Sequence, residues 1–265
     1  MITFKNYLAE KKAVFVTFGR MNPPTKGHGL LLDTIKEQAG KNPYRIFLSH
    51  SQDNKKNPLM YEDKIKFARK MFPSHSRNIH KSDSRNILEV ATQLFNEGFL
   101  TLNVVVGSDR QEEFQERLDH YNGKLYEFAT IKVISAGNRD ADSDGIEGVS
   151  ASQAREYVTE NDYHAFNFML PAHINDLESK KLFNNLREGM GFDKVESFKT
   201  EIKKSTELRE KYLKGELFEV GMKVVEEETD QLLTITRLCT NYVICEDDLG
   251  NKYRKWLTTI SQVEE

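Results

Sequence analysis

The sequence predicts an α/β domain built on a mostly parallel sheet, followed by a helical linker and a small all-β domain. Up to Pro171, short apolar runs alternate with stretches of helical period. A charged, helix-like stretch follows, and beyond residue 217 apolar residues recur at every second position. These three observations divide the chain into a tail at 1–12, an α/β domain at 13–192, a charged helical linker at 193–216 and a β domain at 217–265.

Four apolar runs predict the strands of the α/β domain, because each is short and rich in Val, Ile and Phe. They lie at 13–18, 44–48, 101–106 and 128–134. Between them, apolar residues with helical spacing predict helices that include residues 30–39, 65–72 and 87–95. Repeated strand–helix–strand units predict a parallel sheet with helices on both faces. In such a sheet, ligands bind outside the carboxyl ends of the strands.

The later part of the chain has a different pattern. Residues 174–215 are expected to be helical, and the seven basic and six acidic residues at 193–216 indicate a solvated connecting helix. After residue 217 the alternating apolar residues are Phe218, Val220, Met222 and Val224. They favour a small SH3-like barrel, a fold whose usual work is binding, so a partner protein is expected for this domain.

The charge and apolar content exclude several classes of protein. Lys and Arg total 38 against 41 Asp and Glu, a formal charge of -3, so a general nucleic-acid binder is not expected. The longest apolar runs have four residues, far fewer than the ~18 of a membrane span, and the first twelve residues do not read as a secretory signal. Cys239 and Cys245 suit free thiols in a reducing cytoplasm.

The first candidate motif runs from Gly19 to His28, between the first strand and the first long helix. A strand-to-helix turn gathers backbone N–H groups and the positive end of a helix dipole, which favours phosphate. Gly27 lets the backbone approach a ligand, and His28 projects a donor toward the same anion. The alternative is an ordinary turn with a capping Thr and a surface histidine.

The second candidate motif, 148–155, also leads from a glycine turn into a predicted helix. Ser150 can cap that helix and Ser152 can donate to a phosphate oxygen. Arg155, three residues beyond Ser152, lies on the same helix face with a fork suited to phosphate. Two helix starts with phosphate-binding side chains are expected to converge at one sheet edge.

Together these segments resemble the signature of the nucleotidyltransferase superfamily, which includes nicotinamide-nucleotide, phosphopantetheine and glycerol-phosphate nucleotidyltransferases. The first motif, (His or Thr)-x-Gly-His, is matched by Thr25, Lys26, Gly27 and His28. The second, Ile-Ser-(Ser, Ala or Gly)-(Thr or Ser)-x-x-Arg, is matched by Val149, Ser150, Ala151, Ser152 and Arg155. The resemblance covers residues 13–171 and implies a Rossmann-like fold; Thr25 replaces the commoner His and Val149 replaces Ile.

The resemblance implies transfer of a nucleoside monophosphate to a phosphorylated acceptor, with pyrophosphate leaving together with Mg²⁺. In such a reaction the protein mainly aligns the reactants and neutralises growing negative charge. The expected catalytic residues are His28, Thr25 and Arg155. The expected nucleotide-binding residues are Gly19, Arg20, Lys26, Gly27, Ser150 and Ser152. ATP is the expected substrate and Mg²⁺ the cofactor, with no protein metal ligand expected.

The acceptor is expected at the ends of later strands. The polar loop 49–59 is similar to a segment of archaeal-type nicotinamide-nucleotide adenylyltransferases, and it places Lys55, Lys56 and Asn57 near an acceptor phosphate. A solvated surface loop is the alternative. Asp109, after the third strand, is suited to a ribose hydroxyl or an amide, or only caps the next helix. Arg139 follows the next strand and is a further candidate.

Two further features of the sequence are not assigned to a functional site. The aspartates at 140–144 imitate the start of a calcium loop, but its twelfth position is Ala151, so calcium is rejected. His75 and His80 are interpreted as surface histidines.

The tail resembles the tag by which some tailed bacteriophages direct proteins into the prohead, with cleavage after Leu8-Ala9-Glu10. A short amphipathic helix docking on the core is the alternative. The whole chain also resembles uncharacterised nucleotidyltransferases of such phages. The expected location is therefore the cytoplasm of a host cell, and packaging in the virion is left open.

The leading hypothesis is an adenylyltransferase that makes NAD from nicotinamide mononucleotide and ATP. One alternative keeps the fold but changes the substrates: a cytidylyltransferase or another adenylyltransferase that acts on a sugar, polyol or pantetheine phosphate. The other is a virion-associated binding protein with an inactive domain. Whether the chain forms a homo-oligomer is left open.

Overall fold

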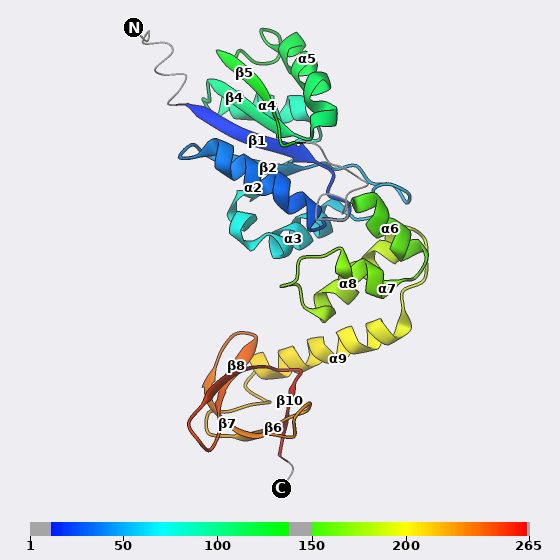
Figure 1. Cartoon of the computed structure of the whole chain (residues 1–265), viewed down its shortest axis with the longest axis vertical. Coiled ribbons are helices and arrows are strands. Elements are labelled where there is room, and N and C mark those ends of the chain that lie inside the picture. Colours follow the sequence, from blue (N-terminus) through cyan, green and yellow to red (C-terminus); the bar gives the residue numbers. More distant parts are fainter. Residues whose placement is uncertain (1–11, 138–149, 264–265) are drawn as a thin grey trace. The chain divides into compact units, whose positions relative to one another are not determined.

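The computed structural model describes residues 12–137 and 150–263, and the chain divides into two compact units, Met1–Lys194 and Val195–Glu265. The first unit is built on five strands, all parallel, in the order β3-β2-β1-β4-β5 (Figure 1). Their bounds are β1 Ala13–Gly19, β2 Tyr44–Leu48, β3 Ile79–His80, β4 Thr101–Val106 and β5 Thr130–Ser135. The predicted α/β fold with a parallel sheet is therefore confirmed.

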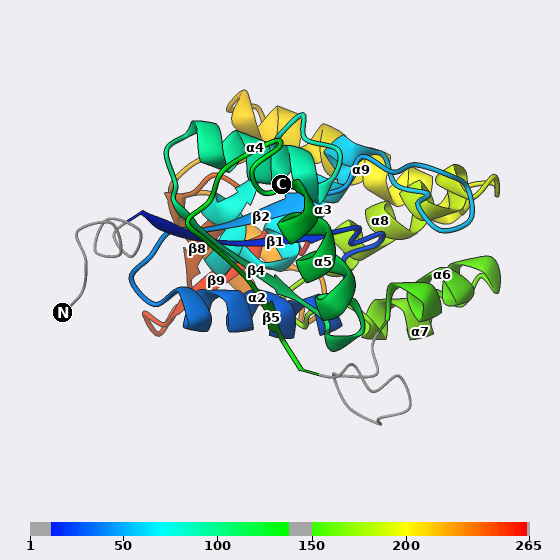
Figure 2. The ribbon, with the colours of Figure 1, turned by 90° about the horizontal axis from the view of Figure 1, so that it is seen from above.

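Helices cover both faces of this sheet. They are α2 Gly27–Ala39, α3 Tyr61–Met71, α4 Ile87–Asn96 and α5 Gln111–Tyr121, with short 3-10 turns η1 Pro73–Asn78 and η2 Ser108–Arg110. On one face Ile35 of α2 packs with Phe15 and Val105. On the other face Leu94 of α4 and Leu118 of α5 enter a larger apolar cluster. Figure 2 shows the sheet between α2 and α4.

The strand order reverses next to β1. The chain moves from β1 to β2 and β3 on one side and then returns to β4 on the other side of β1. A crevice opens outside the carboxyl ends of the strands at such a switch point. Because β1 ends at Gly19, the first motif leaves the sheet at this place.

Strand β3 is absent from the strands expected from the sequence. It has only two residues, too few to show a period. Strand β5 begins at Thr130 instead of residue 128, and Phe128 lies buried in the core before it.

The interpretation of His75 as a surface histidine is wrong. Its side chain is buried, with Nε2 3.0 Å from Asp33 Oδ1 and Nδ1 3.0 Å from the Tyr44 hydroxyl. His80 is half-buried and stacks on Phe47, and burial lowers the pKa of His80. His75 lies in η1 and His80 in β3, and both pack against residues that are distant along the chain. The spacing of residues in the sequence does not reveal such contacts.

Three further helices complete the first unit: α6 Ala151–Thr159, α7 Tyr163–Phe168 and α8 Asp176–Gly189. The rings of Phe166 and Phe183 meet at 5.2 Å between centroids and join α7 to α8. At its end α8 passes very close to the loop after β2. A Cβ atom on Gly189 would lie 2.1 Å from the carbonyl oxygen of Pro58, so only glycine fits there.

Replacement of Gly189 by Ala is therefore expected to destabilise the first unit, by about 1–3 kcal/mol, because the backbone at Pro58 must move. Urea unfolding measures this change. The matched control is Gly29→Ala in α2, where a new Cβ meets only the Phe72 ring at 3.6 Å and stability is expected to be kept or raised. Equal stability of the Gly189→Ala variant and the unmodified protein would contradict the expectation.

The second unit contains a helix and an antiparallel sheet. Helix α9 spans Glu196–Leu213, and the strands are β6 Lys223–Glu226, β7 Leu232–Leu238, β8 Tyr242–Glu246, β9 Lys252–Trp256 and β10 Ile260–Gln262. The sheet order is β10-β6-β7-β8-β9, so the last strand pairs with the first. The small all-β region that the alternation predicts is thus confirmed.

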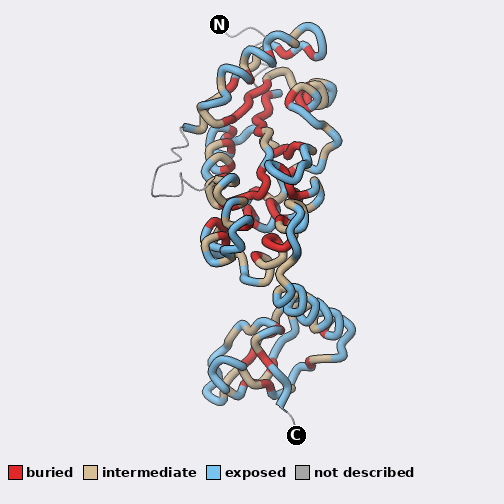
Figure 3. The backbone as a smooth tube through the Cα atoms, turned by 90° about the vertical axis from the view of Figure 1, so that its right-hand side faces the viewer, coloured by how far each residue is buried: buried red, intermediate tan, exposed pale blue. Residues whose placement is uncertain are grey.

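Each unit has a buried core of its own (Figure 3). In the second unit Tyr212 of α9 packs with Val224, Ile235 and Val243. The expected four-part division of the chain stays a prediction. Among the described residues, no helix has the length and apolarity that a membrane crossing needs. The tail residues 1–11, Arg139 and the aspartates at 140–144 lie outside the described residues.

Candidate active site

The first motif holds His28 in a defined orientation at the start of α2. The backbone N–H of Thr25 donates to His28 Nδ1 at 3.1 Å, and Thr25 Oγ1 lies 3.0 Å from the same nitrogen. Because Nδ1 accepts a hydrogen bond, the proton of the neutral ring sits on Nε2. Both side chains are buried. Thr25 and His28 therefore act as one unit that orients an Nε2–H donor.

The second motif is arranged at the start of α6. The Ser150 hydroxyl oxygen accepts from the backbone N–H of Gln153 at 3.1 Å, so this serine caps the helix as expected. Arg155 Nη2 donates to Ser152 Oγ at 3.0 Å. The two side chains share a face of α6, as their spacing predicts.

Arg155 also joins the second motif to the first. Its Nη1 donates to the backbone carbonyl oxygen of Asn22 at 2.6 Å, although 133 residues separate the two. Burial and the positive charge of Arg20 lower the pKa of Arg155, while Asp53 acts in the opposite direction. The guanidinium nevertheless keeps its charge at neutral pH. The structure thus gathers the two helix starts, Arg20 and Asp53 in one place.

The loop after β2 lies beside this place. The Ser49 backbone N–H donates to the Gly19 carbonyl oxygen at 2.9 Å. Farther along, Asp53 Oδ1 accepts from the backbone N–H groups of Lys56 at 2.6 Å and Lys55 at 2.9 Å. These bonds hold the pKa of the Asp53 carboxyl well below its usual range. They also shape the turn from which both lysine side chains extend into solvent.

Asn22 ties the first motif to this loop, a role that sequence reasoning missed. Its side chain accepts from the Leu59 N–H at 3.0 Å and donates to the Leu59 carbonyl at 3.2 Å. Asn22 is buried, and its partner lies 37 residues away, so no local pattern signals the pairing.

Two buried polar atoms of the loop have no hydrogen-bond partner among the described residues: Ser49 Oγ and Asn57 Oδ1. The amide nitrogen of Asn57 donates to Asp53 Oδ2 at 2.5 Å, which fixes the direction of its side chain. An unpaired polar atom in the interior is costly, so such atoms mark positions that a ligand or a water satisfies.

Lys64 of α3 is fully buried beneath the same loop. Its ammonium donates to the carbonyl oxygens of Ser49 and Ser51, which flank His50. Burial lowers the pKa of Lys64 to about 8. Sequence reasoning missed Lys64 because a lysine on a helix usually points into solvent.

The buried Lys64 predicts a pH-dependent stability. In the folded chain it loses its proton near pH 8, and in the unfolded chain near 10.5. Between these values the unfolded state binds more protons, so the free energy of unfolding rises with pH. The rise is expected to be about 3 kcal/mol relative to a Lys64→Met variant, which lacks the group. Urea unfolding of both proteins from pH 7 to 10.5 measures it, and parallel pH dependences would contradict it.

A cavity of about 470 Å³ lies beyond the carboxyl end of β2 and is lined by His50, Ser51 and Arg85. The His50 ring stacks on Tyr61 with 3.7 Å between centroids. His50 Nε2 lies 2.7 Å from the carbonyl oxygen of Ser82. The cavity therefore combines a fixed aromatic stack, a hydroxyl and a cation.

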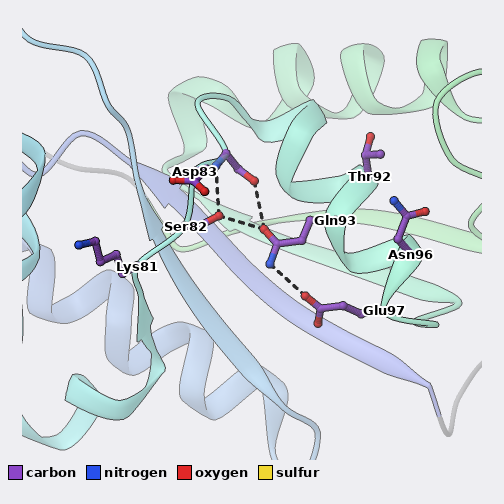
Figure 4. A pocket seen from close by; sticks show the side chains of 8 residues that line it. Lys81, Ser82, Asp83, Thr92, Gln93, Asn96 and Glu97 are labelled. Atoms are coloured by element: carbon purple, nitrogen blue, oxygen red, sulfur yellow. Dashed lines mark hydrogen bonds between the residues drawn. The ribbon is translucent and has the colours of Figure 1, made fainter.

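A second hollow of about 660 Å³ lies beside α4 (Figure 4). Its wall is polar, but the groups bond to one another. The Ser82 and Ser84 hydroxyls donate to Gln93 Oε1 at 2.9 and 3.1 Å, and Gln93 Nε2 donates to Glu97 at 2.9 Å. This hollow shares no residue with either motif.

Three other expected site residues are Lys26, Asp109 and Arg139. The Lys26 ammonium lies 3.7 Å from the centroid of the exposed Phe168 ring at the end of α7. Asp109 is exposed in η2. The cap position of α5 is Arg110, where no side-chain cap is formed, so the alternative in which Asp109 only caps the next helix is wrong. Arg139 lies outside the described residues.

The described residues hold no group of three or more His, Cys, Asp or Glu side chains arranged to bind a metal ion. Mg²⁺ in proteins is commonly held by one or two carboxylates together with substrate phosphates and water.

A parallel sheet at whose carboxyl edge two helix starts meet is an arrangement that many α/β proteins use to bind ligands. Residues 16–157, more than half of the chain, match the model of the cytidylyltransferase-like family, and the chain belongs to this family. No curated protein matches the sequence.

Three solved structures show partial likeness. The nicotinic acid mononucleotide adenylyltransferase of Plasmodium falciparum, complexed with NaAD, has 13% identity and a TM-score of 0.44, covering 67% of this chain and 95% of its own. A Bacteroides Pif1 bound to ssDNA has 14% identity and a TM-score of 0.20, covering 94% of this chain and 71% of its own. A structure of two coordinating Pif1 helicases at forked dsDNA has 12% identity and a TM-score of 0.17, covering 96% of this chain and 76% of its own.

Proposed function

We propose that the protein transfers AMP from ATP to a phosphorylated acceptor, with nicotinamide mononucleotide as the acceptor and NAD as the product. The observation that carries this proposal is the bond from Arg155 to the Asn22 carbonyl, which joins the two candidate motifs beside His28. Membership in the cytidylyltransferase-like family supports nucleotidyl transfer as the reaction class.

In the proposed reaction an oxygen of the acceptor phosphate forms a bond to the α-phosphorus of ATP. The bond from that phosphorus to the oxygen bridging to the β-phosphate breaks, and pyrophosphate leaves with the bonding electron pair. His28, oriented by Thr25, donates from Nε2 to phosphate oxygens as negative charge grows on them. Arg155 and Ser152 add donors from the second motif, and Arg20 adds positive charge.

The other nucleotide contacts follow from the same placement. Gly19 and Gly27 border the turn of the first motif, where backbone approaches the phosphates, and Ser150 holds the start of α6. Lys26 would leave Phe168 to reach the triphosphate. A Mg²⁺ bound by the triphosphate would neutralise charge on the leaving pyrophosphate.

The cavity at His50, Ser51 and Arg85 is the proposed acceptor site. It lies at the ligand edge, and the His50–Tyr61 stack offers a flat surface to a planar base such as nicotinamide. Arg85 supplies positive charge for the acceptor phosphate. Further proposed acceptor contacts are Lys55, Lys56, Asn57, Asp109 and Arg139.

The test is a pyrophosphate-release assay with the purified full chain, Mg²⁺ and a panel of acceptors. The panel holds nicotinamide mononucleotide, nicotinic acid mononucleotide, glycerol phosphate and phosphopantetheine, each with ATP and with CTP. Release with ATP and nicotinamide mononucleotide, and a product with the mass of NAD, is expected. Turnover only with CTP would replace ATP by CTP in the proposal, and folded protein that is silent with every pair would overturn it.

A further inference from the structure

Within the described residues of the second unit, one face of the sheet packs against the core and the other carries exposed and half-buried side chains. Helix α9 packs onto this core through Tyr212, whose hydroxyl donates to the Cys239 carbonyl. Side chains alternate across a strand, so the buried Val243 and Cys245 of β8 point into this core. Eight residues on the opposite face, here together named the outer face, are Thr234, Arg237, Tyr242, Ile244, Glu246, Lys252, Arg254 and Trp256.

The outer face combines aromatic rings with positive charge. The guanidinium carbon of Arg254 lies 4.7 Å from the centroid of Tyr242 and 5.9 Å from that of Trp256, and the two rings meet edge-on at 5.8 Å. Trp256 is nevertheless 45% exposed. Lys252 and Arg237 extend the positive charge along and across the sheet, and Glu246, 4.0 Å from Lys252, is the one carboxylate among the eight residues.

Strand β9 is also an edge of the sheet. Among the described residues it pairs only with β8, so one side of its backbone has no strand neighbour. An extended peptide can add to such an edge through backbone hydrogen bonds, and every second side chain of that peptide then lies on the outer face. There it meets Lys252, Arg254 and Trp256 in order.

The positive charges on the outer face favour an added strand that carries carboxylates. Carboxylates two positions apart on the added strand would meet Lys252 and Arg254, and an apolar side chain two positions farther would meet Trp256. A long polyanion fits less well, because the turn before β9 carries Asp247 and Asp248, which repel phosphates beyond the end of the strand. This favours a short acidic segment of a protein over nucleic acid.

We propose that the free edge and the outer face of β9 bind an extended acidic segment of a partner protein, with its carboxylates on Lys252 and Arg254 and an apolar side chain on Trp256. The proposal uses residues of the second unit alone and does not rest on nucleotidyl transfer. The contacts are charge-assisted and exposed, so the affinity falls as salt increases.

The full chain carries its own reporter, because Trp256 is the only tryptophan in the sequence. The probe is a synthetic decapeptide in which Glu and Thr alternate and one central Glu is replaced by Leu. A saturable change in Trp256 emission at low salt, weakened by added salt, is expected. The same decapeptide with Lys in place of Glu is expected to cause no change.

Variants then locate the contact by the anisotropy of a labelled decapeptide. Arg254→Ala and Lys252→Glu are each expected to raise the dissociation constant about tenfold or more, whereas Lys204→Ala on an exposed position of α9 leaves it unchanged. Circular dichroism confirms that the variants are folded. An equal response to the Lys peptide, no response to either peptide, or tighter binding of oligothymidylate would overturn the proposal, and the last result would assign the face to nucleic acid.

Discussion

Replacement of His28 by Ala is expected to lower kcat for nucleotidyl transfer by about 10²–10³-fold, the usual cost of removing one oriented donor from a developing negative charge. The reason lies in the way the ring is held. Thr25 supplies a backbone N–H to Nδ1, so Nε2 carries the proton and presents it as a donor. Steady-state pyrophosphate release with saturating ATP and acceptor measures the change.

The histidine control is His120→Ala, which removes an exposed imidazole from α5. It is expected to leave kcat unchanged. A Thr25→Val variant tests the orientation separately: it removes the hydroxyl but keeps the backbone N–H that fixes the tautomer, so a smaller loss than for His28→Ala is expected. If kcat of the His28→Ala variant equals that of the unmodified protein, the ring does not act on the reacting phosphate.

Replacement of Arg155 by Met is expected to lower kcat/KM for ATP by about 10²–10³-fold, because one side chain supplies both a charge and a link between the motifs. Its two terminal nitrogens bond in two directions, to Ser152 Oγ and to the Asn22 carbonyl. Arg155→Lys is expected to recover only part of the loss, since an ammonium lacks the planar fork that reaches both partners.

Kinetics with ATP as the varied substrate measures this effect, and thermal unfolding separates it from a loss of folding. The matched control is Arg77→Met, which removes an exposed guanidinium from η1 and is expected to change neither kinetics nor stability. Full activity of the Arg155→Lys variant would show that charge alone is needed and that the bond to Asn22 is not used.

The elements that sequence reasoning predicted are those whose signal is local. The apolar runs and the helical spacing identified β1, β2, β4, α2 and α4, because burial on one side of an element leaves a period in the chain. The cap at Ser150 and the shared face of Ser152 and Arg155 depend only on residues within one turn of helix.

The features that the sequence does not predict depend on partners that are distant along the chain. Strand β3 is recognisable only by its pairing with β2. Lysine is usually a surface residue, and Lys64 is buried only because the loop after β2 folds over it. The same holds for His75, whose partners Asp33 and Tyr44 lie far from it along the chain, so its local sequence predicts an exposed side chain.

The sequence by itself determined that the protein has an α/β domain and, after it, a region of alternating strands. It also placed two groups of candidate phosphate-binding residues at predicted helix starts. Periodicity and turn chemistry suffice for that, because both act over a few residues. Only the tertiary structure decided that Arg155 reaches Asn22 across 133 residues, and that Lys64 lies under the loop of the proposed acceptor site. It also decided which sheet face of the second unit packs into that unit's core, since burial and contact depend on which distant segments pack together.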